Sequence, residues 1–469
     1  MPKDTKFVCS QCGNEFSKWQ GKCEACGEWN AIVEVKLQTS TPLLKFAKEP
    51  GKPEKLSAIA GGNEDRVQTG IKEFDRCLGG GIVTGEVILL AGRPGIGKST
   101  LLLQVCEAVS AVKGGKILYA SGEESAAQIK MRASRLGARG DIIFYQNSNI
   151  LEVLEEAEKF LSFKEAGSDE AGLPAEALAQ AGKPTLLIID SIQSMYSPDF
   201  PGSAGGLVQV QAVGSLLVNF AKTNNVAVIA TGHVTKEGTA AGPRVLEHMV
   251  DAVLYLDGDK YHELRVLRGE KNRFGPTDEV GVFLLEEKGL VEVKNPSGVL
   301  LGERISSPGS VVAATVEGTR PFLVEIQALV SKTNFGYPKR TASGFDAGRL
   351  SLLLAVLEKR AGVLLSSFDV FLNTVGGFRV GEPAVDLAVC LALASARSGK
   401  VVKDGVCVFG EVGLSGEVRS VRFGEKRIKE AEKLGFSKII VPKEAGNAGG
   451  KIQLVRVKTV GEAVKEALS

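Results

Sequence analysis

The sequence predicts a mixed α/β chain built around a parallel β-sheet with crossover helices. From about residue 55, short apolar runs typical of buried strands alternate with segments whose apolar residues recur at helical spacing. Because parallel strands need long crossover connections, this alternation favours a sheet covered by helices. The chain has 469 residues, of which 44% are hydrophobic, so its length is sufficient for about three domains.

The individual elements follow from these patterns. We expect a helix over 209–223, where apolar residues recur at helical spacing. The segment 164–183 is rich in Ala, Gly and Glu with weak periodicity, which indicates a surface insertion. The remaining expected elements are a helix at 125–136 and strands at 116–121, 141–145, 185–189 and 226–230.

The segment from Gly92 to Ser99 has the spacing G-x-x-x-x-G-K-S of a phosphate-binding loop. It lies between an apolar strand-like run at 87–91 and a helix-like segment at 99–109, which disfavours a chance glycine turn. Such a loop turns backbone N–H groups toward a phosphate, while Lys98 can reach the β- and γ-phosphates and Ser99 can hold Mg²⁺. The sequence therefore predicts that the chain binds a nucleoside triphosphate. The candidate nucleotide-binding residues in this loop are Gly92, Arg93, Pro94, Gly95, Ile96, Gly97, Lys98, Ser99 and Thr100.

Acidic residues follow two of the expected strands. The apolar strand 185–189 ends in Asp190, the usual position of a carboxylate that coordinates Mg²⁺. Glu123 and Glu124 follow the strand that ends at Ser121, so either could orient or deprotonate the attacking water. We favour Glu123 for this catalytic role. The alternative is an acidic pair that caps the following helix.

Four of the eight cysteines form two C-x-x-C pairs near the start of the chain. Two such pairs present four thiolates tetrahedrally, as structural Zn²⁺ requires; a disulfide framework and an iron–sulfur cluster are the alternatives. Trp19 and Trp29 flank the second pair, and we expect them to cover the metal site rather than to contact DNA or a partner. The candidate metal ligands are Cys9, Cys12, Cys23 and Cys26.

Charge and apolar content exclude some classes of function. The formal net charge is only +2, so any contact with nucleic acid must be local. The longest apolar run, 384–396, contains Asp386, and no run is long enough to span a bilayer. The sequence begins with charges and cysteines rather than an apolar signal core, so we expect a cytoplasmic protein without a membrane partner.

In order and combination, these motifs resemble a RecA-type ATPase and, more closely, the bacterial RadA family, also called Sms. The resemblance covers essentially the whole chain, because the C-terminal part resembles the Lon protease domain. It implies a C4 zinc-finger module at 1–34, a linker at 35–56, a RecA-like ATPase domain at 57–293 and a Lon-protease-like domain at 294–469. The matching motifs are Lys18-Trp-x-Gly-x-Cys-x-x-Cys-x-x-Trp29, the phosphate loop, Ser121-Gly-Glu-Glu-Ser125 and Lys271-Asn-Arg-Phe-Gly275.

The resemblance also implies a function that the residues alone do not indicate. It implies a DNA-dependent ATPase that moves along single-stranded or branched DNA and promotes branch migration in homologous recombination and repair. It also implies a homohexameric ring of helicase type that works with a RecA-type recombinase. An ATP-powered, Lon-like machine that remodels or degrades proteins is the alternative.

Lys271 and Arg273 are the candidate residues for catalysis between subunits. They follow an expected strand at 263–267, beyond the central sheet, and we do not expect them to reach their own nucleotide. On an extended segment, side chains two residues apart point the same way, so both could touch one phosphate group. In RecA-type rings the equivalent cations reach the γ-phosphate of the neighbouring subunit, where an arginine can be worth about 10³–10⁵ in rate. A solvated basic turn and a DNA contact are the alternatives.

Two loops occupy the places where RecA-type proteins contact DNA. The loop 194–206 is rich in Gly, Ser and Pro, with almost no charge. The Gly-rich loop 231–244 carries Lys236 and Arg244, which we expect to neutralise DNA phosphates, and His233, which we expect to sense the state of the nucleotide.

The C-terminal part raises the question of proteolysis. The segments 381–396 and 410–418 resemble Lon proteases, in which a lysine activates a serine nucleophile. The serine position corresponds to Ala384 and the lysine position to Glu425, with Lys426 next to it. Alanine cannot be a nucleophile, so we expect a scaffold for ring assembly without proteolytic activity. A DNA surface on this scaffold could include Lys332, Lys339, Arg340 or Arg349.

Overall fold

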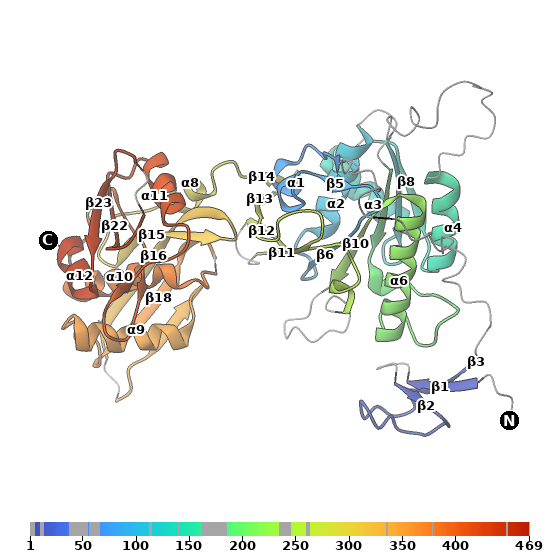
Figure 1. Cartoon of the computed structure of the whole chain (residues 1–469), viewed down its shortest axis with the longest axis horizontal. Coiled ribbons are helices and arrows are strands. Elements are labelled where there is room, and N and C mark those ends of the chain that lie inside the picture. The colour runs from blue at the N-terminus through green and yellow to red at the C-terminus, as the bar shows by residue number, and fades with distance from the viewer. Residues whose placement is uncertain are drawn as a thin grey trace. The chain divides into compact units, whose positions relative to one another are not determined.

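The computed structural model describes residues 5–9, 14–36, 55, 66–111, 115–138, 140–161, 185–233, 245–258, 263–333, 336–377, 379–446 and 449–468. They form two compact units, one of Met1–Asp257 with Arg265–Glu292 and one of Gly258–Leu264 with Val293–Ser469 (Figure 1). Most of the expected linker and the expected insertion at 164–183 lie outside the described residues. Within the described ranges, no helix has the length and apolar character needed to cross a bilayer.

The N-terminal module is a three-stranded antiparallel sheet in the order β2–β1–β3. Its strands are β1 (Thr5–Cys9), β2 (Glu15–Phe16) and β3 (Ile32–Lys36). Among the described residues of the module, the buried core comprises Cys9, Cys23, Ala31 and Ile32, with Phe7 and Phe16 packed against it. Such a small core cannot stabilise a fold alone, so the module depends on an additional crosslink such as a metal ion.

The first unit is built on a nine-stranded sheet in the order β14–β13–β12–β11–β6–β10–β9–β7–β8 (Figure 1). Six adjacent strands run parallel, and helices cover both faces, which confirms the predicted α/β class. The parallel strands are β6 (Val87–Gly92), β7 (Lys116–Ser121), β8 (Ile142–Gln146), β9 (Thr185–Asp190), β10 (Ala227–His233) and β11 (Ala252–Asp257).

Helices of the first unit form two layers, one on each face of the sheet. The apolar side chains of each parallel strand alternate between these layers, so both faces of the sheet are dry. On one face lie α4 (Ile150–Leu161) and α6 (Leu207–Asn224), and on the other lie α1 (Lys72–Cys77), α2 (Lys98–Ser110) and α3 (Ala126–Leu136). The short strands β4 (Arg66–Val67) and β5 (Ile82–Val83), which precede and follow α1 in the chain, pair antiparallel.

The remaining edge of this sheet departs from the prediction. Strand β12 (Leu264–Asn272) runs antiparallel to β11, and β13 (Val280–Glu286) and β14 (Gly289–Glu292) form an antiparallel pair. The expected strand at 263–267 is therefore only the first half of β12, and Lys271 lies within the sheet rather than beyond it. Antiparallel strands need no crossover helix, so the alternation that indicates parallel strands is missing from this part of the sequence.

The second unit contains a mixed seven-stranded sheet in the order β17–β18–β16–β15–β19–β22–β23. Helix α11 (Gly424–Lys433) closes a core against one face, and α10 (Asp386–Ser398) packs on β15 and β16 and contacts α9 and α12. The strands are β15 (Ser310–Glu317), β16 (Arg320–Lys332), β17 (Arg340–Ser343), β18 (Phe368–Thr374), β19 (Val406–Val408), β22 (Lys438–Pro442) and β23 (Gln453–Val457). The other elements are α8 (Pro296–Leu301), α9 (Ala347–Arg360), α12 (Val460–Leu468), β20 (Glu411–Val412) and β21 (Val418–Arg419).

Glu86, which precedes β6, is a buried carboxyl group in the first unit. Its side chain is 2% exposed, and its Oε1 atom has no hydrogen-bond partner. Burial is the main cause that raises the pKa of Glu86 from 4.5 to about 8. Between these two values the folded protein keeps a proton that the unfolded chain has released, so the free energy of unfolding falls as pH rises.

We therefore expect Glu86→Gln to be more stable relative to the unchanged protein at pH 8.5 than at pH 5, because glutamine carries no buried charge at either pH. Calorimetric unfolding of the full chain at both pH values measures this difference. Glu155→Gln is the matched control, because it makes the same chemical change at an exposed position of α4. An equal effect of Glu86→Gln at both pH values would contradict a raised pKa.

Candidate functional site

The predicted phosphate loop joins the end of β6 to the start of α2. Gly92 is needed because a Cβ atom there would lie 2.6 Å from the Leu256 carbonyl oxygen. Gly97 caps α2 at a φ of +117° and offers no side chain, so the first N–H groups of the helix stay available to an anion. Behind the loop, the buried Arg265 donates from Nε to the Ile96 carbonyl at 3.2 Å. Sequence reasoning missed Arg265, because β12 carries several charged residues and nothing in the sequence distinguishes the buried one.

Lys98 is 5% exposed, and its ammonium group is surrounded by acceptors. Nζ donates to the Gly92 and Arg93 carbonyls at 2.9 and 3.2 Å and lies 3.0 Å from Nδ1 of His233. Burial lowers the pKa of Lys98 to about 8, and the nearby carboxylates of Asp190 and Glu123 offset part of this effect. The lysine is therefore held at the mouth of the loop, where its charge interacts with both carboxylates.

His233 lies between the phosphate-loop lysine and Glu123. Its Nδ1 accepts from the ammonium of Lys98, which leaves the proton on Nε2, 3.8 Å from the Glu123 carboxylate. Burial first, and then the charge of Lys98, lower the pKa of His233, which keeps the imidazole neutral near pH 7. A neutral ring with one donor and one acceptor suits the predicted role of sensing the nucleotide.

Asp190, at the end of β9, is 7% exposed and is fixed by two hydroxyl groups. Tyr119 donates to Oδ2 at 2.5 Å, and Thr231 donates to Oδ1 at 2.6 Å. Partners of this kind orient a metal-binding carboxylate. Neither Tyr119 nor Thr231 was identified from the sequence, although each is a hydroxyl residue within an otherwise apolar strand.

The two glutamates after β7 have different surroundings. The Ser121 hydroxyl oxygen accepts from the N–H groups of Glu123 and Glu124 at 3.3 and 3.1 Å. Arg132 of α3 binds the Glu124 carboxylate through two hydrogen bonds of 2.6 and 2.8 Å. Glu123 accepts from the Ser191 hydroxyl and remains 46% exposed beside His233.

The alternative in which the acidic pair caps α3 is wrong. Ser125 caps this helix, because its Oγ accepts from the N–H of Gln128 and the Gln128 side chain returns a hydrogen bond to the Ser125 backbone. The surroundings of Glu123 therefore keep its carboxylate open for the predicted catalytic role.

These groups meet because the parallel strands share a direction. In the sheet register, His233 is level with Gly92, and Ser121 is level with Asp190. The phosphate loop, Glu123, Asp190 and His233 therefore lie at the carboxyl edge of the parallel strands, the usual binding edge of such sheets.

The segment 271–275 lies at the opposite edge. Asn272 is level with Ala252 in β11, and Ala252 is level with Ile88 near the start of β6. Arg273 lies one residue further from the carboxyl edge than Asn272, since its N–H donates to the carbonyl of Asp251, which precedes Ala252. The distance of this hydrogen bond is 3.0 Å. At about 3.3 Å per residue, Arg273 is separated from the level of Gly92 by roughly 16 Å along β6. This placement keeps Arg273 away from the phosphate loop of its own chain.

The expectation that Lys271 and Arg273 point together at one phosphate group is wrong for this conformation. Lys271 Nζ donates to the carbonyls of Glu247, His248 and Val250 at 2.6, 3.3 and 2.8 Å, which uses its three donors. The chain turns after Asn272, whose side-chain oxygen accepts from the Phe274 N–H at 2.9 Å. Side chains two residues apart point the same way only in an extended chain, so this rule does not hold for Lys271 and Arg273.

The rest of the segment is held in place while the Arg273 side chain stays 55% exposed. The Lys222 ammonium lies 5.4 Å from the centre of the Phe274 ring, and Arg66 donates to the Phe274 carbonyl. Gly275 packs against backbone, because a Cβ atom there would lie 3.2 Å from the Gly79 Cα. Phe274 and Gly275 are thus anchored, while the guanidinium group of Arg273 stays partly exposed at the surface.

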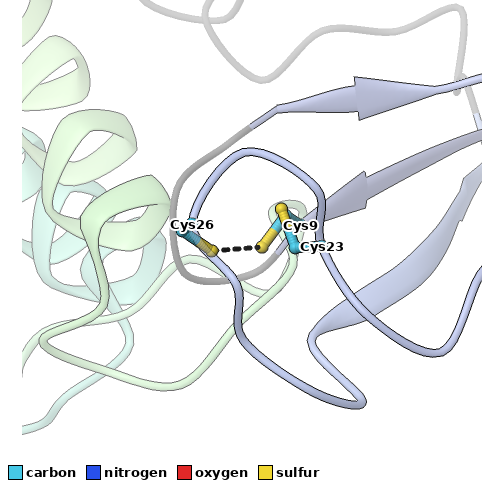
Figure 2. A group of neighbouring side chains, drawn as sticks. All are labelled: Cys9, Cys23 and Cys26. Atoms are coloured by element: carbon cyan, nitrogen blue, oxygen red, sulfur yellow. Dashed lines mark hydrogen bonds between the residues drawn. The ribbon is translucent and has the colours of Figure 1, made fainter.

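Three of the four candidate metal ligands lie together (Figure 2). The thiols of Cys9, Cys23 and Cys26 are within 4.8 Å of one another, and Cys12 lies outside the described residues. The sulfur atoms of Cys9 and Cys26 are 3.7 Å apart, too far for a disulfide. Two thiolates bound tetrahedrally at about 2.3 Å from one Zn²⁺ would be separated by about 3.8 Å. The described thiols therefore fit a tetrahedral metal ion.

The tryptophans do not cover this site as predicted. Trp19 and Trp29 are 57% and 67% exposed. Both rings lie next to Gly21, where a Cβ atom would be 3.9 Å from each of them. The Trp19 indole N–H donates to the Ile32 carbonyl at 3.0 Å, which fixes this ring along the module's surface.

In the second unit, the segment at Ala384 contains no nucleophile. Ala384 is fully buried, and the α11 side chain that reaches this segment is Arg427, which binds Glu382 at 2.7 and 2.6 Å. The expected counterpart of the Lon lysine, Glu425, instead lies beside Gly446. Two residues along a helix differ by about 200° in direction, so Glu425 and Arg427 lie on different faces of α11. Arginine stays protonated and cannot act as a general base.

The candidate DNA residues are described only in part. Lys236 and Arg244 lie outside the described residues. The first of the two loops is anchored, because the buried Gln209 bonds Ser197 and the Phe200 carbonyl. In the second unit, Arg349 is bound to the buried carboxylate of Asp386, so it is not an ordinary solvated cation. The side chains of Lys332, Lys339 and Arg340 are exposed.

Comparison with known proteins gives matches to separate parts and to the whole chain. The family models that match are the KaiC ATPase at residues 67–295, the rubredoxin metal binding domain at 7–34 and subunit ChlI of Mg-chelatase at 376–445. Among solved structures, the RadB recombinase is 24% identical and covers 48% of this chain and 99% of its own, with a TM-score of 0.35.

Several curated relatives match from end to end. DNA repair protein RadA of Listeria monocytogenes is 46% identical over 474 residues, which cover 99% of this chain and 98% of the relative. The RadA protein of Streptococcus pyogenes is 45% identical over 475 residues, with 100% and 99% covered. That of Bacillus subtilis is 44% identical over 476 residues, with 99% and 98% covered. On this similarity, carried over the full chain together with the ATPase fold and the cysteine module, the protein belongs to the RadA family of DNA repair proteins.

Proposed function

We propose that this protein is a DNA-dependent ATPase that works as a motor and promotes branch migration in homologous recombination and repair. It acts in the cytoplasm on single-stranded or branched DNA, as a homohexameric ring that cooperates with a RecA-type recombinase. The observation that carries the proposal is the position of Arg273 at the sheet edge opposite the phosphate loop of its own chain. A cation placed there can act on ATP only at the site of a neighbouring subunit.

The residues at the carboxyl edge can divide the work of hydrolysis among them. Backbone N–H groups of the loop and Lys98 would bind the phosphates, and Ser99 and Asp190 would hold Mg²⁺, which would neutralise charge on the phosphates. Glu123 orients or deprotonates the attacking water, since its carboxylate is exposed beside Lys98 and His233.

Arg273 supplies charge to the transition state from the next subunit. Phosphoryl transfer is catalysed mainly by positioning and by charge stabilisation, so a guanidinium brought in by a neighbour is worth about 10³–10⁵ in rate. Coupling each site to its neighbour also makes hydrolysis depend on assembly. Lys271 remains a candidate for the same role only if it leaves the three carbonyls that now bind it.

The alternative of a Lon-like machine that remodels or degrades proteins has less support. Ala384 offers no nucleophile, and the neighbouring cation is Arg427, which is 1% exposed and paired with Glu382. A buried arginine pair of this kind supports a scaffold role rather than proteolysis. Proteolytic activity is therefore proposed to be absent.

For the cysteine module we expect about one zinc ion per purified chain, lost in Cys23→Ser, because three thiolates cannot close a structural site of this kind. Elemental analysis of the full chain measures it. Cys407→Ala changes a buried cysteine of the second unit and should leave the metal in place. Iron in place of zinc, or full zinc retention by Cys23→Ser, would contradict the assignment.

For Arg273 we expect the variants Arg273→Ala and Lys98→Ala each to lose nearly all ATP turnover in the presence of single-stranded DNA. When the two are mixed and co-assembled, some turnover should return. The reason is that an intact phosphate loop of an Arg273→Ala chain then lies beside an intact Arg273 of a Lys98→Ala chain. Turnover and mass in solution are measured together.

The matched control mixes Arg273→Ala with the double variant Lys98→Ala/Arg273→Ala, which has neither part and should restore nothing. An absence of recovery despite proven co-assembly would show that Arg273 does not act between subunits. If Arg273→Ala instead hydrolyses ATP normally and only loses DNA, the segment is a contact to the DNA backbone.

A further inference from the structure

We propose that Asp251 is the positioning residue of Arg273, a buried carboxylate that sets the direction in which the guanidinium leaves the subunit. The proposal rests on the proposed action of Arg273 at a neighbouring ATP site. It concerns a residue that carries the wrong charge to bind a phosphate, so any effect on hydrolysis must pass through another group.

Asp251 is fixed to the central strand of the sheet. It is 2% exposed and directly precedes β11. Its Oδ2 accepts from the Val87 N–H at 3.0 Å, while its own N–H donates to the Val87 carbonyl at 2.9 Å. These two bonds hold both the backbone and the carboxylate of Asp251 against the start of β6.

Two cations share the carboxylate of Asp251. Lys222 of α6 donates to Oδ2 at 2.7 Å, and Arg273 Nη1 lies 3.4 Å from Oδ1. Since the Val87 N–H and Lys222 occupy Oδ2, the other oxygen is left to face Arg273. The carboxylate therefore has a fixed orientation before Arg273 reaches it.

Arg273 is tied to Asp251 at two points. Its N–H donates to the Asp251 carbonyl at 3.0 Å, and its guanidinium meets the Asp251 carboxylate. A long arginine side chain samples many rotamers unless a partner selects one. The guanidinium has five N–H donors, so one held by Asp251 leaves others for a phosphate, and the side chain is 55% exposed.

Asp251, the anchor of Arg273, and the phosphate loop lie at the two ends of β6. Asp251 is bonded to Val87 at the start of β6, and β6 ends at Gly92, the first residue of the loop. All six residues of β6 are buried, so the strand is a rigid spacer. The position of Arg273 is thereby fixed relative to the phosphate loop of the same subunit.

Asp251→Asn tests this proposal in the full chain, because asparagine still accepts from Val87 but does not attract the guanidinium. We expect KM for ATP to change less than about threefold while kcat falls about tenfold or more, the pattern of an interaction made in the transition state. Added to Arg273→Ala, the change should cost no further turnover, because both variants act through one group. Mixed with Lys98→Ala, the Asp251→Asn chain should regain turnover, since its own loop is intact.

Glu325→Gln is the matched control, since it makes the same change from carboxylate to amide at a 2% exposed residue of β16 in the second unit; we expect its kcat to stay within about threefold of the unchanged protein. Should Asp251→Asn fail to fold, as judged by ATP binding and thermal unfolding, Asp251→Glu keeps the charge and moves the anchor by one methylene. We expect from it the same loss of kcat without a change in KM.

Loss of turnover in Arg273→Ala combined with normal kcat in a folded Asp251 variant would overturn the positioning role alone. Normal turnover in Arg273→Ala would instead overturn the proposed action between subunits.

Discussion

Much of this protein depends on the direction of β6 within the nine-stranded sheet. The strand carries the phosphate loop at its carboxyl end and bonds Asp251 at its amino end. Because neighbouring strands run parallel to it, the candidate catalytic side chains gather at the same edge as the loop. The antiparallel β12 runs the other way and delivers Arg273 to the far edge. One strand length therefore separates Arg273 from the phosphate loop of the same chain, and we propose that two subunits bring these two parts together.

The sequence was sufficient for the parts of the site that depend on local patterns. The loop from Gly92 to Ser99 and the strand ending at Asp190 each follow from a short apolar run next to a characteristic polar residue. The cysteine spacing likewise placed Cys9 near Cys23 and Cys26, because a thiol cluster of this kind must close around one point.

Contacts between distant segments could not be predicted. Arg265 reaches Ile96 across 169 positions, and Lys271 is bound by carbonyls that lie more than twenty positions earlier. Neither contact has a spacing that a single sequence reveals. The exposure of Trp19 and Trp29 could not be predicted for a similar reason. Whether a ring covers the metal site depends on the path of the loop that carries it, which the spacing of residues does not reveal.

We propose that the ATP site is completed by Arg273 of a neighbouring subunit. The most direct measurement is an electron cryomicroscopy structure of the full chain with single-stranded DNA, Mg²⁺ and a nucleotide that mimics the transferring phosphoryl group. We expect a guanidinium nitrogen of Arg273 within about 3 Å of that group in the adjacent subunit, with Asp251 still bonded to the same side chain. An assembled ring in which Arg273 contacts only DNA or solvent, with the site closed by other residues, would contradict it.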